Sequence, residues 1–391
     1  MATALQGLRI LDFTALWPGP LATLVLADLG AEVLRVEAPD RPDLLRYLPP
    51  LDGRGEGAAW SMVNRNKRSI VVDLRTAGGQ AVVRRLVEHY DIVVEQFRPG
   101  VLDRLGVGFE ALRAVQPRLI WCAITSYGQD GPWRDRPGHD INFLAVSGLS
   151  SHMGRPGQGP APWTALPGDV GGGTWPAVAG ILAATLQRER TGNGQLVDIS
   201  MADGALFLNA LAVCQALNGG GSQQAGQGVL GGETAYDHYR TRDGRYLAVG
   251  ALEPKFWVQF CATLGRPDLC DAAQDSPAEV TALKAAIANE VAAHDAGHWD
   301  AVFAQVPCCV DVVRTTEEAL NLPQFVARTV VQPGPGGPQL RSPVRLHDQP
   351  VQAARPGAEP GADTDAILAE IGLDGHEINQ LRQDGAVGGP A

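Results

Sequence analysis

The first 200 residues of the chain alternate short apolar runs with segments of helical periodicity. Leu8–Phe13 and Ala31–Glu37 are apolar runs of strand length, and Leu21–Leu29 between them has the spacing of a helix that Gly30 ends. This order predicts a β-α-β unit, and its repetition predicts an α/β fold with a parallel sheet and helices on both faces. Further strands are expected at Ser69–Leu74, Asp91–Glu95, Arg118–Ile124 and Gln195–Ile199. Further helices are expected at Gly78–His89, at 174–188 and at Ala202–Ala216.

The pattern changes after residue 217. Asn218–Gly232 is rich in Gly and Gln, and we place a linker at 201–232. Beyond it, Tyr236–Thr241 and Arg245–Gly250 flank Arg-Asp-Gly, which is typical of a β-hairpin. We therefore expect a small α+β domain at 233–324 and a large domain made of 1–200 and 325–391.

The C-terminal segment is expected to contain a helix and a tail. Thr364–Arg382 has helical periodicity and predicts one helix. Gly385–Ala391 is rich in Gly and is expected to be a frayed tail.

Composition and charge narrow the class of protein. The chain has 391 residues, of which 45% are hydrophobic and 19% charged, as in a globular protein with a sizeable core. Its net charge of -11 argues against nucleic acid or an anionic membrane as a partner. The N-terminus lacks a signal-peptide pattern, and the most apolar stretches, Val178–Leu186 and Ala205–Leu217, are shorter than a membrane span. We expect a cytoplasmic protein.

The six cysteines favour neither a metal site nor a disulfide framework. They form no Cys-x-x-Cys pair and lie in apolar segments, so reduced core thiols are expected. They are Cys122, Cys214, Cys261, Cys270, Cys308 and Cys309.

Two turns after predicted strands are candidates for ligand binding. Glu37 ends the second strand as a ribose-binding acid would, but the turn 15–20 lacks the GxGxxG that nicotinamide dinucleotides require. The segment Glu95–Gly106 is the better anion site. Arg98 and Arg104 follow a strand there and have the fork geometry that suits phosphates, although solvated loop arginines are the simpler interpretation.

Two titratable residues are candidates for acid–base catalysis. His139 follows a Gly at the edge of an apolar helical segment, and a histidine titrates near neutral pH. Asp169 stands next to Gly171–Gly173, whose glycines permit close approach by a ligand. Taken alone, His139 fits a structural histidine and Asp169 fits a helix N-cap.

Taken together and in order, these segments resemble the class III CoA-transferase superfamily, most closely its α-methylacyl-CoA racemase branch. The resemblance spans nearly the whole chain. The segments that carry it are Leu8–Glu37, Asn64–Ile70, Phe97–Val101, Pro117–Ile120, Gly138–Asn142, Gly168–Gly173, Thr191–Gln195 and Asp243–Pro254. Among them, Gly138–Asn142 is specific to the racemases.

The resemblance implies a fold, a partner and a substrate. The fold is a Rossmann-like large domain plus a small domain, in an interlocked homodimer. The substrate is an acyl-CoA, so CoA is part of the substrate, and no metal or redox cofactor is required. The acyl chain itself is left open.

The resemblance also assigns roles to residues. His139 and Asp169 would exchange protons with the α-carbon on its two faces. The backbone N–H of Asp140 would stabilise the enolate oxygen, and Glu253 of the partner chain would support His139. By itself Glu253 fits a solvated carboxylate at a helix start. The residues implied for CoA are Leu16, Val72, Phe97, Arg98 and Arg104.

Two other functions compete with the racemase. A CoA-transferase of the same superfamily would use Asp169 as a nucleophile, but the transferases generally have a non-basic residue at the position of His139, and formyl-CoA transferases have Gln in the slot of Trp17. A non-catalytic acyl-CoA binder would not need all three candidate catalytic residues. Two positions depart from the pattern of the family. Ala38 stands where many relatives have Arg, and Glu233 lies in a segment where racemases commonly have Ala-Pro.

Overall fold

The computed structural model describes residues 3–348 and 354–389 and contains two compact units. The first unit consists of Met1–Ser147, Trp163–Ala210 and Val326–Ala391. The second consists of Gly148–Pro162 and Leu211–Phe325.

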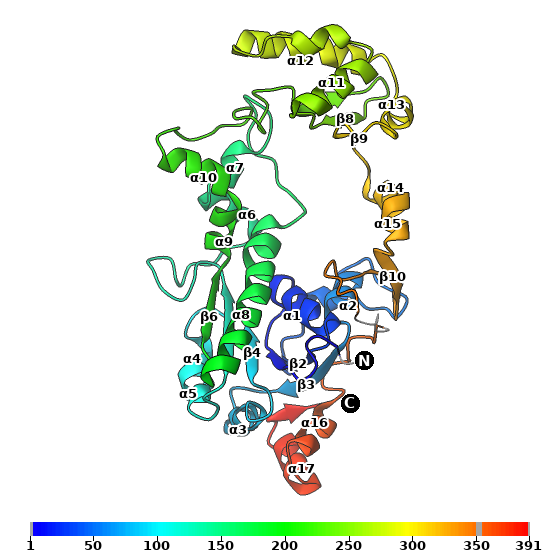
Figure 1. The fold of residues 1–391 in the computed structure, drawn as a ribbon. Coiled ribbons are helices and arrows are strands. Elements are labelled where there is room, and N and C mark those ends of the chain that lie inside the picture. The colour runs from blue at the N-terminus through cyan, green and yellow to red at the C-terminus, as the bar shows by residue number, and fades with distance from the viewer. Residues whose placement is uncertain (1–2, 349–353, 390–391) are drawn as a thin grey trace. The chain divides into compact units, whose positions relative to one another are not determined.

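A seven-stranded sheet is the centre of the first unit (Figure 1). Its order is β12-β3-β2-β1-β4-β5-β6, and all neighbours are parallel except β12, which runs antiparallel to β3. This confirms the predicted α/β fold with a large parallel sheet. The strands are β1 (Arg9–Asp12), β2 (Glu32–Glu37), β3 (Lys67–Val72), β4 (Ile92–Glu95), β5 (Ile120–Thr125), β6 (Leu196–Ser200) and β12 (Val387–Gly388).

Helices cover both faces of this sheet because its strands are apolar on both sides. On one face, residues of six adjacent strands form a buried cluster with α3, α16 and α17. On the other face, α1 packs on β1 and β2, and α8 packs on β5 and β6. The helices of this unit are α1 (Pro18–Asp28), η1 (Leu44–Tyr47), α2 (Ala58–Asn64), α3 (Ala77–Leu86), α4 (Val101–Arg104), α5 (Phe109–Arg113), α6 (Asp140–Val146), η2 (Pro167–Thr174), α8 (Trp175–Thr191), α9 (Met201–Leu208), α16 (Thr364–Glu370) and α17 (Gly375–Gln383). A hairpin of β10 (Val331–Gly334) and β11 (Gly337–Leu340) also belongs to it.

The second unit has its own core. A three-stranded antiparallel sheet, in the order β7-β8-β9, packs with helices around a buried cluster in which Phe260 stacks on Phe303. The predicted hairpin is confirmed, since β7 and β8 are antiparallel and flank Arg242–Gly244. The elements are α7 (Leu149–His152), α10 (Ala210–Leu217), β7 (Asp237–Arg240), β8 (Tyr246–Val249), α11 (Pro254–Thr263), η3 (Pro267–Asp271), α12 (Pro277–Val291), α13 (Ala296–Phe303), β9 (Val310–Val312), α14 (Thr316–Leu320) and α15 (Pro323–Ala327), of which α10 and α15 cross unit boundaries.

Three expectations about local structure are wrong. The helix expected at Thr364–Arg382 is two helices, because Gly372 between them has a φ of 87° that ends the first. The tail expected to fray contains β12, in which Val387 pairs with Val72 and is buried; residues 390 and 391 lie outside the described residues. The helix expected at Ala202–Ala216 is divided into α9 and α10 at Asn209.

The cysteines only partly follow the prediction. All six are free, as expected, and Cys122, Cys261 and Cys308 are buried. Cys214 and Cys309 are exposed, so they are not core thiols. In the described part of the chain, no helix is long and apolar enough to cross a membrane.

A buried ion pair fastens α1 to the sheet. Lys67 Nζ, on β3, lies 3.1 Å from Asp12 Oδ2, on β1, and both side chains are almost fully buried. The same Nζ donates to the carbonyl oxygen of Pro20 at 2.9 Å and to Thr23 Oγ1 at 2.8 Å. Burial lowers the pKa of Lys67 to about 8, while the Asp12 carboxylate opposes that shift. The pair therefore fixes the first turn of α1 against two strands.

We expect Lys67→Ala to destabilise the protein by about 3–5 kcal/mol, because it leaves the Asp12 charge buried without its partner. The measurement is the midpoint of chemical denaturation followed by tryptophan fluorescence. Arg75→Ala, which removes an exposed cation that pairs with Asp73 and Asp40, is the control and should shift the midpoint much less. Equal shifts in the two variants would contradict this account.

Candidate active site

The site residues lie at the carboxyl ends of the parallel strands. Ligands bind at this edge in open α/β sheets because the loops after neighbouring strands meet there. Here, the turn after β1, the loop after β2 and the loop after β4 line two cavities. Both cavities lie within the first unit.

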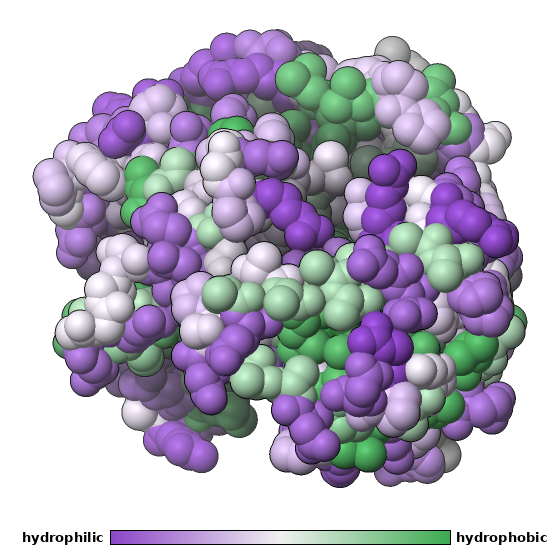
Figure 2. Space-filling model, turned by 90° about the horizontal axis from the view of Figure 1, so that it is seen from above, coloured by the Kyte–Doolittle hydropathy of each residue, from purple (hydrophilic) through white to green (hydrophobic). Residues whose placement is uncertain are grey.

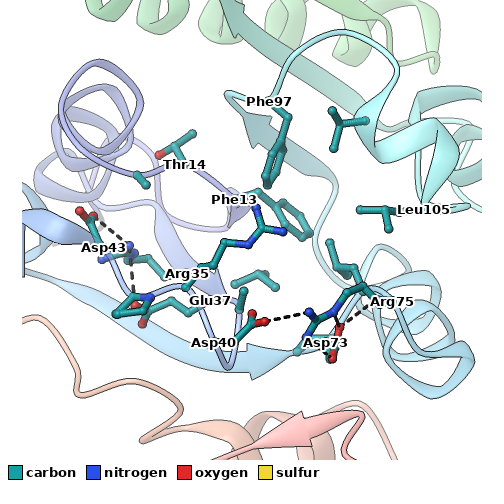
Figure 3. A pocket seen from close by; sticks show the side chains of 18 of the residues that line it. Phe13, Thr14, Arg35, Glu37, Asp40, Asp43, Asp73, Arg75, Phe97 and Leu105 are labelled. Carbon is teal, nitrogen blue, oxygen red and sulfur yellow. Dashed lines mark hydrogen bonds and ion pairs between the residues drawn. The ribbon is translucent and has the colours of Figure 1, made fainter.

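The larger cavity has a volume of about 640 Å³ and has apolar and charged walls (Figure 3). Phe13, Phe97 and Leu105 line part of it. On another side, Arg75 lies between two carboxylates, 2.8 Å from Asp40 and 2.7 Å from Asp73. An aromatic wall beside cations suits a nucleotide, whose base is flat and whose phosphates are anionic.

The smaller cavity, of about 180 Å³, brings His139 and Asp169 together. Trp17, Gln96 and Arg98 also line it. His139 and Asp169 are 30 positions apart in the sequence, so their meeting depends on how α6 and η2 pack. A base and an acid in one small cavity are the minimum that proton transfer requires.

Two glycine positions permit this packing. A Cβ at Gly138 would lie 2.6 Å from the Phe143 ring, so only glycine fits directly before His139. A Cβ at Gly172, in η2, would lie 2.6 Å from the carbonyl oxygen of Met201, and one at Gly204 would lie 2.3 Å from the carbonyl oxygen of Gly172. Backbones of η2 and α9 are therefore in direct contact, which fixes the segment that carries Asp169.

Hydrogen bonds fix the two functional segments relative to each other. The backbone N–H of His139 donates to Asn142 Oδ1 at 3.0 Å, which sets the start of α6. Asp140 follows, and its Oδ1 accepts from the backbone N–H of Asp169 at 2.9 Å. Since Asp140 is buried, this bond joins α6 to η2 at the edge of the cavity. Asp169 lies in a π-helix, a wide turn that is frequent at functional sites.

The electrostatics of Asp169 differ from those of an ordinary carboxyl. Burial and the nearby Asp140 carboxylate raise the pKa of Asp169 to about 6, and His139 opposes both effects. A carboxyl with a pKa near 6 exchanges protons readily close to neutral pH, which suits an acid or base catalyst.

The residues implied for CoA do not all fall in one place. Leu16, Val72 and Phe97 line the larger cavity, and Leu16 and Phe97 line the smaller one as well. Arg98 lines only the smaller cavity, and Arg104 lines neither.

The position of Arg104 can still be described. Arg104 Nη1 lies 3.3 Å from where a Cβ of Gly100 would be, so it flanks the loop after β4. Glu253 belongs to the second unit, where it is exposed at the start of α11.

Sequence reasoning missed several lining residues. Gln96 donates from Nε2 to the carbonyl oxygen of Ala15 at 3.0 Å and accepts at Oε1 from the N–H of Gly19 at 3.2 Å, so it joins two loops. Arg136, whose guanidinium carbon lies 4.9 Å from the centre of the Trp133 ring, also lines the smaller cavity. Its place three residues before His139 was a usable signal, whereas the role of Gln96 depends on a contact between distant loops.

The described residues contain no group of three or more His, Cys, Asp or Glu side chains that fits a metal ion.

Comparisons with known proteins identify the family of the chain. The profile of CoA-transferase family III matches residues 5–365. The chain belongs to this family. The match covers the residues that line both cavities and all of the second unit.

Similar proteins include both racemases and transferases. The chain is 35% identical over 383 residues to the α-methylacyl-CoA racemase of Mus musculus, covering 97% of this chain and 96% of the relative. It is 33% identical over 361 residues to the acetyl-CoA:oxalate CoA-transferase of Acetobacter aceti, covering 90% and 92%. A solved CAIB/BAIF family protein from Brucella suis superposes with a TM-score of 0.84 at 30% identity, covering 95% of this chain and all 100% of that one. Membership in the family is thus shown, while the branch is not decided by identity.

We expect Asp140→Asn to shift the acid limb of the pH profile of kcat/KM to lower pH. The ionised form of Asp169 is lost as the pH falls through about 6, and removal of the neighbouring negative charge lowers the pKa of Asp169. The amide oxygen of Asn still accepts the N–H of Asp169, so the geometry is kept. An acid limb that stays in place or moves upward would contradict the assignment of this limb to Asp169.

Proposed function

We propose that this protein inverts the α-carbon of 2-methylacyl-CoA thioesters. The observation that carries the proposal is the pairing of His139 with Asp169 in one small cavity, where the pKa of Asp169 is about 6. A reaction that removes and returns one proton needs two groups that each change protonation near neutral pH. The raised pKa of Asp169 supports this role, and His139 is the second proton-transfer group in the same cavity.

The proposed reaction moves only protons. One member of the pair removes the α-proton, the electron pair of the C–H bond forms a C=C bond, and the thioester oxygen becomes an enolate. The other member then delivers a proton to the opposite face, which inverts the centre. No electron is gained or lost overall, so the chemistry uses no redox cofactor.

The enolate needs a hydrogen-bond donor that is already in place. We assign this role to the backbone N–H of Asp140, the first residue of α6. Among the described residues, that N–H has no acceptor, and it lies directly after His139 in the chain. An amide held by the start of a helix is suited to negative charge that develops during reaction.

The two cavities suit the two ends of an acyl-CoA. We place the nucleotide in the larger cavity, with Leu16, Val72 and Phe97 on its walls, and the thioester in the smaller one. Arg98 would bind a phosphate from the smaller cavity, and Arg104 from beside Gly100. Ala38 lines the larger cavity, where many relatives have an arginine, and the adjacent Arg41 supplies a cation there.

We also propose that the protein is a homodimer whose sites are shared. Apolar side chains are exposed on α9, where Phe207 has 80% of its surface accessible, and the surface in Figure 2 mixes hydrophobic with hydrophilic residues. An exposed apolar patch is typical of an interface. In this arrangement Glu253 of one chain would support His139 of the other. The two chains would interlock, each with a large domain at 1–200 and 325–391, a linker at 201–232 and a small domain at 233–324.

CoA transfer is the second candidate, because the chain resembles transferases almost as closely as racemases. In that reaction the Asp169 carboxylate would attack the thioester carbonyl, forming a mixed anhydride and releasing CoA thiolate. The thiolate would then attack the aspartyl carbonyl, giving an aspartyl-CoA thioester and releasing the acyl group as a carboxylate. Trp17 and His139, which line the smaller cavity, support the racemase as the first candidate. Trp17 stands at the position where formyl-CoA transferases have Gln, and a basic residue at the position of His139 is uncommon among the transferases.

The decisive experiment is α-proton exchange in deuterated water. We expect the wild-type protein to introduce deuterium at the α-carbon of both enantiomers of a 2-methylacyl-CoA. Asp169→Asn should reduce exchange of one enantiomer by about 10²–10⁴-fold, because only the base on that face is lost. Asp135→Asn, an exposed carboxylate near the same cavity, is the matched control and should exchange normally. Transfer of CoA between acids without any α-exchange would overturn the proposal in favour of the transferase.

A further inference from the structure

Leu16 and Phe97 form the junction between the two cavities. Of the described residues, these two alone line both the larger and the smaller cavity. Leu16 follows β1 and Phe97 follows β4, so the junction is built from two loops that are distant in the sequence. A ligand that occupies both cavities at once must pass between these two side chains.

The backbone of Leu16 is held in an unfavourable conformation. Its φ is 62°, in the left-handed region that a residue with a branched side chain rarely adopts. Such a conformation persists only when the surroundings fix it, and it is frequent at functional sites. Here the Leu16 N–H donates to the Asp43 carboxylate, at 3.3 Å to Oδ2 and 3.4 Å to Oδ1.

Asp43 is itself well fixed. Its side chain is buried, it accepts from the N–H of Leu45 at 3.0 Å, and it forms an ion pair of 3.3 Å with the buried Arg35. The ion pair between Arg35 and Asp43 is visible at the edge of the larger cavity in Figure 3. The carboxylate therefore has little freedom to leave Leu16.

Phe97 is held by a second carboxylate in the same way. Its backbone N–H donates to Glu95 Oε2 at 2.7 Å, and Glu95 is 5% exposed at the end of β4. The Trp121 side chain also donates to Glu95. Gln96 then joins the two loops through its bonds to Ala15 and Gly19.

We propose that Asp43 and Glu95 are positioning residues that fix the junction between Leu16 and Phe97, through which the pantetheine arm of acyl-CoA reaches His139 and Asp169. The inference rests on the proposed function, in which the nucleotide and the thioester occupy different cavities. The arm is flexible, and walls that are rigid before binding reduce the entropy that ordering it costs. Glu95 lines neither cavity, whereas Asp43 lines the larger one. Both carboxylates act on the junction through backbone N–H groups.

The test compares ligands with and without the arm. Dissociation constants are measured by calorimetry for CoA and for adenosine 3′,5′-bisphosphate, which has the nucleotide but no pantetheine. We expect Glu95→Ala and Asp43→Ala each to weaken CoA binding by about tenfold, as the loss of one backbone hydrogen bond would do. Binding of the bisphosphate by Glu95→Ala should stay within about twofold, because Glu95 does not line the cavity in which the nucleotide is placed.

Three further variants separate positioning from loss of folding. Glu95→Gln should recover most of the CoA affinity, since its amide oxygen accepts the Phe97 N–H. Asp43→Ala should weaken CoA binding less when Leu16 is also changed to Gly, because glycine adopts a φ of 62° without strain. Asp91→Asn, at the other end of β4, is the matched control and should bind both ligands normally.

The outcomes are distinct. Unchanged CoA affinity in Glu95→Ala and Asp43→Ala, or equal losses for CoA and the bisphosphate in Glu95→Ala, would overturn the inference and leave the proposed function standing. A wild-type protein that does not bind CoA would overturn the proposed function, and the inference with it.

Discussion

The hydrogen bond from the Asp169 N–H to the Asp140 carboxylate is the interaction on which the site depends. It is the direct link between the start of α6, which carries His139, and the π-helix η2, which carries Asp169. It also has an electrostatic consequence, because the same Asp140 charge raises the pKa of Asp169. One buried carboxylate therefore sets both the geometry and the protonation of the candidate catalytic pair.

The rest of the first unit supports this arrangement. The Lys67–Asp12 pair holds the first turn of α1, and that turn presents Trp17 and Pro18 to the smaller cavity. Thr174, at the end of η2, donates to the carbonyl oxygen of Pro18 at 2.8 Å, so the two segments are joined. Buried polar groups in this unit are thus concentrated beneath the carboxyl edge of the sheet, where precise placement of loops matters most.

The sequence predicted the parallel sheet well because its central strands are mostly buried on both faces and are rich in apolar residues, as Ile92–Glu95 is. It predicted β12 poorly, since that strand has two residues and is defined by its pairing with β3 rather than by its own pattern. The break after α16 was missed because periodicity continues across Gly372.

In the site, too, residues whose roles depend on contacts between distant segments were harder to predict than residues in local motifs. The resemblance supplied His139 and Asp169, and the structure places them in one cavity. Gln96, Asp43 and Glu95 were not predicted as site residues, because their importance arises from hydrogen bonds between loops far apart in sequence. The role of Glu253 and the homodimer remain predictions.

The central claim is that His139 and Asp169 act on opposite faces of one α-carbon. The most direct measurement is deuterium incorporation from solvent into each separated enantiomer of a 2-methylacyl-CoA by His139→Gln and by Asp169→Asn. The account predicts that each variant still exchanges one enantiomer and that the two variants retain opposite ones. Retention of the same enantiomer by both variants, or full interconversion by either, would contradict it.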